Sequence, residues 1–301
     1  MKRDFLTLWD LSSQEINLLL KRAIELKSGK DLHKCPLIGR SIALLFEKAS
    51  TRTRVSLEVG IYQLGAKAIY MNPKEIQLGR GETIRDTAKV LSRYLDAIVI
   101  RTFSHDMLIE FASNSSIAII NGLSDLHHPC QALADLMTIL EKKGKLRDIR
   151  LAYIGDGNNV ANSLIEAASR MGINLTIACP KEYEPDPDVL KRARASAKSE
   201  IVILRDPKKA VNGADVVYTD VWVSMGQEKE TKTKKVKLKG YQINNKILSY
   251  AKKDAIVLHC LPAHRGEEIT DDVLDGPQSV VIDQAENRLH TQKALLEFLL
   301  V

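Results

Sequence analysis

Short apolar runs alternate with amphipathic stretches along the first part of the chain. The apolar runs predict strands at 41–46, 67–71, 97–101 and 117–120. Amphipathic stretches at 52–64, 83–95 and 104–114 predict the helices between them. An earlier helix opens at the capping box of Ser12 and Glu15 and ends near Gly29. Continuous apolar strands that alternate with helices are typical of a parallel sheet covered on both faces.

The same alternation restarts after a helix predicted from Pro129 to Gly144. Strands are predicted at 150–155, 174–179, 200–204, 215–219, 255–260 and 279–283, and a last helix at 284–300. We therefore expect an α/β protein with two doubly wound parallel-sheet units, hinged near residues 137–148. Ligands of open α/β sheets bind at the carboxyl ends of the strands, so the loops that follow the strands are the ones to inspect.

Composition agrees with a globular protein of about two domains. The chain has 301 residues, 45% apolar and 27% charged, and no apolar run approaches the ~20 residues of a membrane helix. The N-terminus lacks the apolar core of a signal peptide. Four widely spaced cysteines argue against a disulfide framework or a cysteine-rich zinc site, so we expect a reducing, cytoplasmic location and no membrane partner.

The net charge of +6 is compatible with a nucleic acid or with a small anionic substrate. The densest basic run, 229–240, is rich in lysine and has no interleaved aromatic residues. Nucleic-acid platforms need aromatic side chains for base stacking. We expect this run to be a solvated surface loop, with nucleic-acid binding as the alternative.

The segment STRTR, residues 50–54, joins the first strand to a helix. It places the hydroxyls of Ser50, Thr51 and Thr53 and the guanidinium of Arg52 on the first helical turn, followed by Arg54. A helix N-terminus already carries partial positive charge, so arginine there favours a bound anion. The segment predicts a phosphate site. In the simpler alternative, Ser50 or Thr51 only caps the helix.

Other strand-end loops also carry polar side chains. Arg101 ends a strand, and His127, His128, Cys130 and Gln131 lie around a helix start. Adjacent positions rarely converge on one metal ion, so hydrogen bonds from His128 and Gln131 to a ligand are the better interpretation. Arg288 opens the last helix, where a lone arginine is usually a surface residue.

The second half has three candidate loops. GDGNN at 155–159 partly matches a dinucleotide fingerprint, but Val160 replaces its last small residue, and Asn158 and Asn159 could present amides instead. Asp220, Ser224 and Met225 follow one strand, where a carboxylate with a hydroxyl can hold an amine. Cys260 ends another, either as a buried small hydrophobe or, with His259 and His264, as an incomplete zinc set.

Four motifs in this order, STRTR, HPCQ, DVWVSMG and HCLP, resemble the aspartate/ornithine carbamoyltransferase family, and the last two resemble its ornithine branch. The resemblance spans essentially the whole chain. It implies a site in the cleft between two domains joined by interdomain helices. Residues 1–136, with the C-terminal helix at about 286–301, would bind carbamoyl phosphate, and residues 137–285 would bind L-ornithine. The implied reaction gives citrulline and phosphate, as in arginine biosynthesis, without a metal or other cofactor.

The resemblance also implies a role for each motif residue. Arg101, His128, Asp220 and Cys260 would be catalytic. Carbamoyl phosphate would contact Ser50, Thr51, Arg52, Thr53, Gln77, Arg101, His128, Gln131, Cys260, Leu261 and Arg288. Ornithine would contact Asn159, Asp220, Ser224 and Met225.

The remaining expectations concern the oligomeric state of the protein and the alternative activities. The polar stretch 71–91 contains a long loop tipped by Gln77, and the resemblance implies a homotrimer, or a multiple of trimers, in which Gln77 completes the neighbour's phosphate site. A carbamoyltransferase for putrescine or an acylated ornithine is the nearest alternative. An NAD-dependent oxidoreductase, built on GDGNN, is a remote one.

Overall fold

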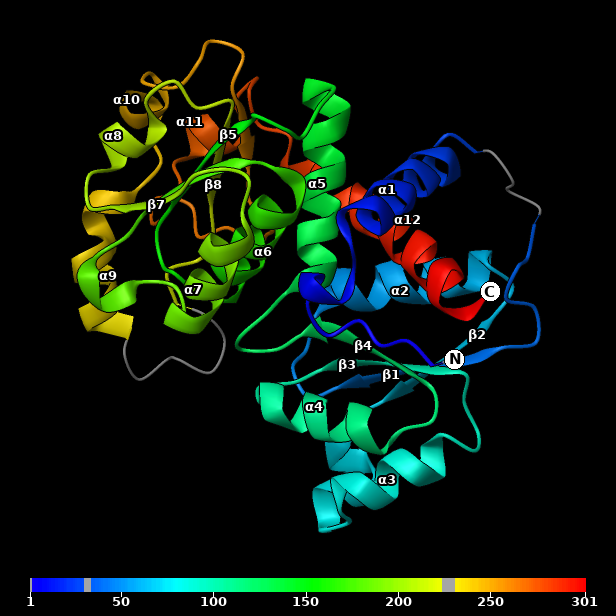
Figure 1. Ribbon diagram of the computed structural model, residues 1–301. Helices are drawn as coiled ribbons and strands as arrows, with labels where there is room; N and C mark the ends of the chain where they lie inside the picture. Colours follow the sequence, from blue (N-terminus) through cyan, green and yellow to red (C-terminus); the bar gives the residue numbers. More distant parts are fainter. Residues whose placement is uncertain (1, 30–33, 224–230) are drawn as a thin grey trace. The chain divides into compact units, whose positions relative to one another are not determined.

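The chain folds into two compact α/β units, each with its own parallel sheet (Figure 1). The computed structural model describes residues 2–29, 34–223 and 231–301. The first unit comprises Met1–Ala134 and Glu286–Val301, and the second comprises Asp135–Ala285. The predicted fold class, two doubly wound parallel-sheet units, is confirmed.

The sheet of the first unit has the strand order β2-β1-β3-β4, with every pair parallel. Its strands are β1 (Ser41–Phe46), β2 (Lys67–Met71), β3 (Ala97–Arg101) and β4 (Ala118–Leu123). The strand order reverses between β1 and β3, which are neighbours although β2 lies between them in sequence. Such a reversal opens a crevice at the carboxyl ends of the two strands, where ligands of this fold class bind.

Helices cover both faces of this sheet (Figure 1). They are α1 (Ser13–Lys27), α2 (Thr51–Gln63), α3 (Ile84–Leu91), α4 (His105–Asn114), the start of α5 (Pro129–Lys143) and most of α12 (Val281–Leu300), with 3-10 turns η1 (Leu8–Asp10), η2 (Pro73–Glu75) and η3 (Gln77–Arg80). Leu108 and Phe111 of α4 pack with Ala88 of α3 against one face of the sheet. α2 and α12 approach closely: a Cβ added at Gly60 would lie 3.1 Å from Lys293.

The sheet of the second unit has the order β7-β6-β5-β8-β9, again all parallel. Its strands are β5 (Arg150–Ile154), β6 (Asn174–Ala178), β7 (Ile201–Leu204), β8 (Val216–Thr219) and β9 (Ile256–Leu258). Its helices are α6 (Asn159–Met171), α7 (Pro187–Ser196), α8 (Pro207–Val211), α9 (Thr231–Leu238), α10 (Asn245–Leu248) and α11 (Asp271–Leu274), with 3-10 turns η4 (Lys181–Tyr183) and η6 (Lys239–Tyr241). The order reverses between β5 and β8, so the loops after these two strands share a crevice.

The strand predicted at 279–283 is wrong. Only Ser279 makes an isolated bridge, to Val257, and α12 begins at Val281. The run of valine and isoleucine was typical of a strand. In the structure it forms the start of a helix that places Val281 in the core of the second unit.

The solvated loop predicted at 229–240 is also wrong for its described part. Thr231–Leu238 is the helix α9 and Lys239–Tyr241 is a 3-10 turn. Lys234, Lys235 and Lys237 form ion pairs with acidic residues elsewhere in the second unit. The segment is therefore attached to its unit through its lysines.

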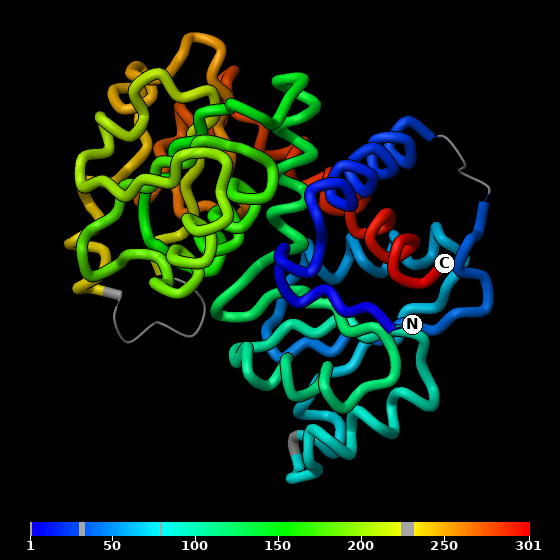
Figure 2. The backbone as a smooth tube through the Cα atoms, viewed as in Figure 1, coloured from blue at the N-terminus to red at the C-terminus, as the bar shows by residue number. Residues whose placement is uncertain are grey.

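Both ends of the chain belong to the first unit, as the blue and red ends of the trace show (Figure 2). Phe5 bridges to Ile120 of β4, and Arg22 of α1 donates to Glu297 of α12. No helix within the described ranges is both long enough and apolar enough to cross a membrane.

Candidate active site

The STRTR segment forms the N-cap and first turn of α2, after the short loop 47–49 that follows β1. Ser50 is the N-cap: its Oγ accepts a hydrogen bond of 3.2 Å from the Thr53 amide and donates to Thr53 Oγ1 at 3.0 Å. The simple capping role is therefore real. It also fixes the position of the Thr53 hydroxyl, which is fully buried.

The two arginines of this turn have different surroundings. Arg54 donates to Glu58 at 2.9 Å, and its guanidinium lies 3.8 Å from the centre of the Tyr70 ring. The Arg54 side chain is thus engaged on the helix surface. Arg52 is half-buried. Of the two, Arg52 is the one to consider for an anion.

Arg288 joins three segments that are far apart in the sequence. It donates from Nη2 to Thr53 Oγ1 at 2.9 Å and from Nη1 to Gln131 Oε1 at 3.2 Å. All three side chains are buried, with at most 4% of their surface exposed. Arg288 is therefore not a surface residue, and its guanidinium brings Thr53 and Gln131 together in the first unit.

Arg101 and His128 lie in the same buried region. Arg101 ends β3 and pairs in register with Phe46, the last residue of β1. The pKa of His128 is held well below its usual range, first by burial and then by the positive charges of Arg288, Arg101 and Lys48. A buried, neutral imidazole surrounded by cations fits a site that binds an anion.

Lys48 is a residue that the sequence analysis missed. Its side chain is buried, with its ammonium 4.0 Å from the centre of the Phe103 ring, and it contacts Asp125. The available signal was its position two residues before STRTR, in the loop that follows β1. Gln77, by contrast, is exposed at the start of η3 and makes no hydrogen bond to the buried cluster within the described residues.

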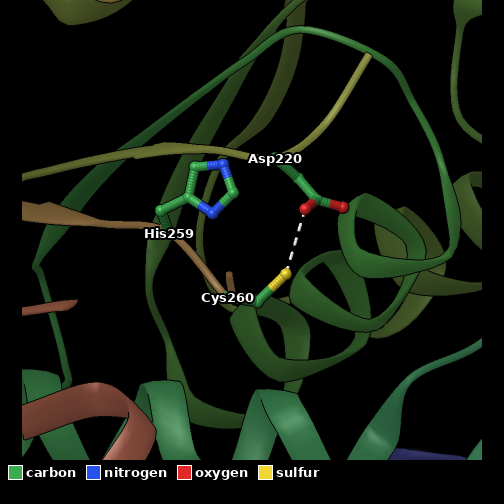
Figure 3. Close-up of side chains that lie close together, drawn as sticks. All are labelled: Asp220, His259 and Cys260. Atoms are coloured by element: carbon green, nitrogen blue, oxygen red, sulfur yellow. Dashed lines mark hydrogen bonds between the residues drawn. The ribbon is translucent and has the colours of Figure 1, made fainter. Parts of the chain in front are cut away.

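The second unit brings Asp220 and Cys260 together at the ends of β8 and β9 (Figure 3). Cys260 Sγ donates to Asp220 Oδ1 at 3.0 Å. The other carboxylate oxygen accepts a hydrogen bond of 2.7 Å from Asn158 Nδ2. Asp220 is 5% exposed, so its carboxylate is buried. The two donors fix the orientation of this carboxylate. A buried carboxylate in a fixed orientation suits a cationic or amine ligand.

His259 supports this region through hydrogen bonds. Its Nδ1 accepts from the amide of Leu261 at 2.9 Å, so the proton lies on Nε2, which is 3.1 Å from Glu268 Oε1. Leu261 has a φ of 56°, a left-handed conformation that is uncommon for this residue type. His259 therefore stabilises the turn that carries Leu261.

The zinc set considered from the sequence, His259, Cys260 and His264, is not gathered at one point. Possible ligands among the described residues gather in two separate groups, one of Asp220, His259 and Cys260, and one of His264, Glu267 and Glu268. His264 is thus not grouped with His259 and Cys260. Both ring nitrogens of His259 are already engaged, and Lys235 contacts Glu267.

The GDGNN loop lies at the crevice between β5 and β8. Asn158 caps α6, because its side-chain oxygen accepts hydrogen bonds from the backbone amides of Val160 and Ala161. Its side-chain nitrogen donates to Asp220. Asn159 is half-buried at the first position of α6. The predicted ornithine residues Ser224 and Met225 lie outside the described residues.

The two halves of the chain match two family models. Residues 3–141 match the carbamoyl-P binding domain of aspartate/ornithine carbamoyltransferase, and residues 147–299 match its Asp/Orn binding domain. The chain therefore belongs to the aspartate/ornithine carbamoyltransferase family, as the motifs indicated.

Individual relatives fall in the ornithine branch. The chain is 54% identical to the ornithine carbamoyltransferase of Syntrophus aciditrophicus over 302 residues, covering 100% of both chains. The solved ornithine carbamoyltransferase of Pyrococcus furiosus is 49% identical, covers 99% of this chain and 97% of its own, and has a TM-score of 0.94. The anabolic enzyme of Campylobacter jejuni, at 41% identity and 99% coverage of each chain, also has a TM-score of 0.94.

Proposed function

We propose that the protein is an enzyme that transfers the carbamoyl group of carbamoyl phosphate to the δ-amine of L-ornithine, giving L-citrulline and phosphate. The observation that carries this proposal is the match of both halves, over the full length, to relatives named ornithine carbamoyltransferase. These comparisons do not favour putrescine, an acylated ornithine or an NAD-dependent oxidation.

The first unit supplies the carbamoyl phosphate residues in this proposal. Ser50, Thr51, Arg52, Thr53 and Arg101 bind the phosphate group, in keeping with the helix N-terminus and the cations described above. Gln131 accepts from the carbamoyl NH₂ group, and Arg288 holds Gln131 in place. Lys48 adds a buried positive charge to the same region.

His128 donates a hydrogen bond to the carbonyl oxygen of carbamoyl phosphate. Its lowered pKa keeps the ring neutral near pH 7, and a neutral imidazole can still donate from one nitrogen. Negative charge develops on this oxygen as the amine attacks. Donors that are already in place stabilise that charge without rearranging, which lowers the barrier.

The second unit supplies the ornithine residues. Asn159, Ser224 and Met225 bind the amino acid, while Asp220 and Cys260 orient the δ-amine. The buried pair of Asp220 and Cys260 supports this assignment, because it presents a carboxylate and a sulfur to one ligand group. The Leu261 carbonyl and Cys260 also contact the carbamoyl NH₂ group.

The reaction follows from these contacts. The neutral δ-amine attacks the carbonyl carbon, a C–N bond forms, and the C–O bond to phosphate breaks. Phosphate leaves with the bonding electrons towards Arg52 and Arg101, and the amine nitrogen passes its proton to the departing phosphate. Much of the rate comes from holding the two substrates in attack geometry, and the proposed reaction uses no metal or organic cofactor.

We further propose a cytoplasmic homotrimer, or a multiple of trimers, that serves arginine biosynthesis. Exposed Gln77, at the start of η3, supports a shared site because its side chain is available to a neighbouring subunit. The four cysteines are free, as expected in a reducing compartment.

One assay tests the proposed function directly. Product formation from carbamoyl phosphate is measured in parallel with ornithine, putrescine, aspartate and acetylornithine. We expect citrulline formation to exceed the other three rates by a large factor. A preference for any other amine, or no carbamoyl transfer at all, would contradict the proposal.

A further inference from the structure

Helix α9 inserts one of its lysines into the interior of the second unit. Lys234 Nζ lies 2.6 Å from Asp156 Oδ2, with side-chain exposures of 3% and 7%. The neighbouring pairs of Lys235 with Glu267 and Lys237 with Glu182 are at least 32% exposed on every side chain. Burying an ion pair costs desolvation free energy, so this pair is weak evidence for stability alone and invites a search for another role.

Asp156 connects this pair to the proposed ornithine residues. The backbone carbonyl oxygen of Asp156 accepts two hydrogen bonds of 2.8 Å. One comes from the backbone amide of Asn158 and the other from the Tyr153 hydroxyl. Asn158 in turn donates from its side-chain nitrogen to Asp220 Oδ2 at 2.7 Å. A short series of contacts therefore leads from Lys234 through the turn at 156–158 to the Asp220 carboxylate.

The turn at 156–158 packs closely against the backbone at 183–185. The Gly157 amide donates to the Tyr183 carbonyl at 2.9 Å, and a Cβ at position 157 would lie only 2.3 Å from the nitrogen of Pro185. The Lys234 ammonium also lies 5.2 Å from the centre of the Tyr183 ring. Lys234 and the backbone at 183–185 thus hold the turn together, and a displacement of Asp156 would reach Asn158.

We propose that Lys234 is a positioning residue for the amine substrate. Lys234 neutralises Asp156 and fixes its position, and thereby keeps the side-chain amide of Asn158 directed at Oδ2 of Asp220. Oδ1 of Asp220 then stays beside Cys260. The inference rests on the proposed function, because it assumes that Asp220 holds the δ-amine. It adds a residue that none of the four family motifs contains and that lies 14 positions after Asp220 in the sequence.

The test compares three variants by steady-state kinetics. In Lys234→Met the KM for ornithine should rise about tenfold, while the KM for carbamoyl phosphate stays near wild type. This factor is the lower end of the loss seen when a metal-binding residue loses the hydrogen-bond partner behind it. Lys234→Arg keeps the charge and should restore most of the ornithine affinity. Lys235→Met, on the same helix, removes the exposed pair with Glu267 and should leave both constants within about twofold of wild type.

Each outcome decides the question. An unchanged ornithine KM in Lys234→Met, or an equal rise in both KM values, would reduce Lys234 to an anchor of α9 and overturn the inference. If Lys234→Met does not fold, Asp156→Asn decides instead, because it keeps the side-chain size and should raise the ornithine KM alone. A wild-type protein that makes no citrulline rejects the proposed function and this inference together. An active wild type with an unaffected variant rejects the inference alone.

Discussion

Arg288 of α12 donates a hydrogen bond of 2.9 Å to the hydroxyl of Thr53 on the first turn of α2, across 235 positions of the chain. The same guanidinium donates to Gln131. The phosphate turn and the start of α5 are thus both tied to the C-terminal helix. Arg288 therefore has a structural role that can be measured separately from any contact with substrate.

Arg288→Met should destabilise the protein and weaken carbamoyl phosphate binding together. The variant keeps most of the side-chain volume but removes a buried donor from Thr53 and Gln131, a loss of about 1–3 kcal/mol. Urea unfolding measures the first effect, and the KM for carbamoyl phosphate measures the second. Arg40→Met removes a pair with Asp96 in which the arginine is half exposed, and should cost less than about 1 kcal/mol. Equal stabilities of the two variants would contradict the role assigned to Arg288.

Arg52→Ala should reduce kcat/KM for carbamoyl phosphate strongly. Loss of a charge-assisted contact to the phosphate should cost about 2–4 kcal/mol of transition-state stabilisation. The matched control is Arg54→Ala on the same turn, because Arg54 is engaged with Glu58 and Tyr70. Steady-state assays with saturating ornithine should separate the two arginines clearly. If both variants behave alike, the assignment of Arg52 to the phosphate is wrong.

Asp220→Asn and Cys260→Ala should impair the use of ornithine and leave carbamoyl phosphate binding largely intact. Each change removes one partner of the hydrogen bond between the cysteine and the carboxylate. Asp220→Asn should have the larger effect, because it also removes the negative charge that attracts the amine. Initial rates at varied ornithine, with direct titration of carbamoyl phosphate, provide the measurement. Weakened carbamoyl phosphate binding with an unchanged ornithine KM would reverse the assignment.

His128→Gln should flatten the decline of stability at acidic pH. The pKa of His128 is lowered in the folded protein by burial and by Arg288, Arg101 and Lys48, whereas its ordinary value is 6.5. Below pH 6.5 the unfolded chain therefore binds a proton that the folded chain does not, and folding loses up to about 1.4 kcal/mol per pH unit.

Urea unfolding of the wild type and His128→Gln between pH 7.5 and 5 isolates this contribution. His105 and His290 also have lowered pKa values, but they are present in both proteins, so their contribution cancels in the difference. The stability of the wild type relative to the variant should fall as the pH drops through 6.5. Parallel profiles would show that His128 is protonated equally in the folded and unfolded states.

Most strands could be predicted because parallel strands buried on both faces form continuous apolar runs. The segment at 279–283 shows the limit of that signal, since valine and isoleucine can also begin a buried helix such as α12. The helix α9 was missed for a different reason. Its lysines look solvated locally, and their partners Asp156, Glu182 and Glu267 lie 78, 55 and 32 positions away.

The candidate site was predictable only in part, for the same physical reason. A phosphate turn can be inferred at STRTR because capping and helix charge are local properties. The burial of Arg288 cannot be inferred locally, because it depends on Thr53 and Gln131 from other elements. Lys48 was overlooked because a lysine next to a loop is usually exposed, and its burial requires Phe103 beside it.

The last prediction concerns Gln77 and the proposed trimer. If exposed Gln77 completes the phosphate site of a neighbouring subunit, Gln77→Glu and Arg52→Ala should each be nearly inactive when alone. After the two proteins are mixed, unfolded and refolded together, some sites combine an intact Gln77 from one parent with an intact Arg52 from the other, and activity should reappear. Each parent refolded alone is the control, and light scattering establishes the trimer. Mixed trimers that stay inactive would show that Gln77 is not shared, and a monomer at micromolar concentration would exclude the arrangement altogether.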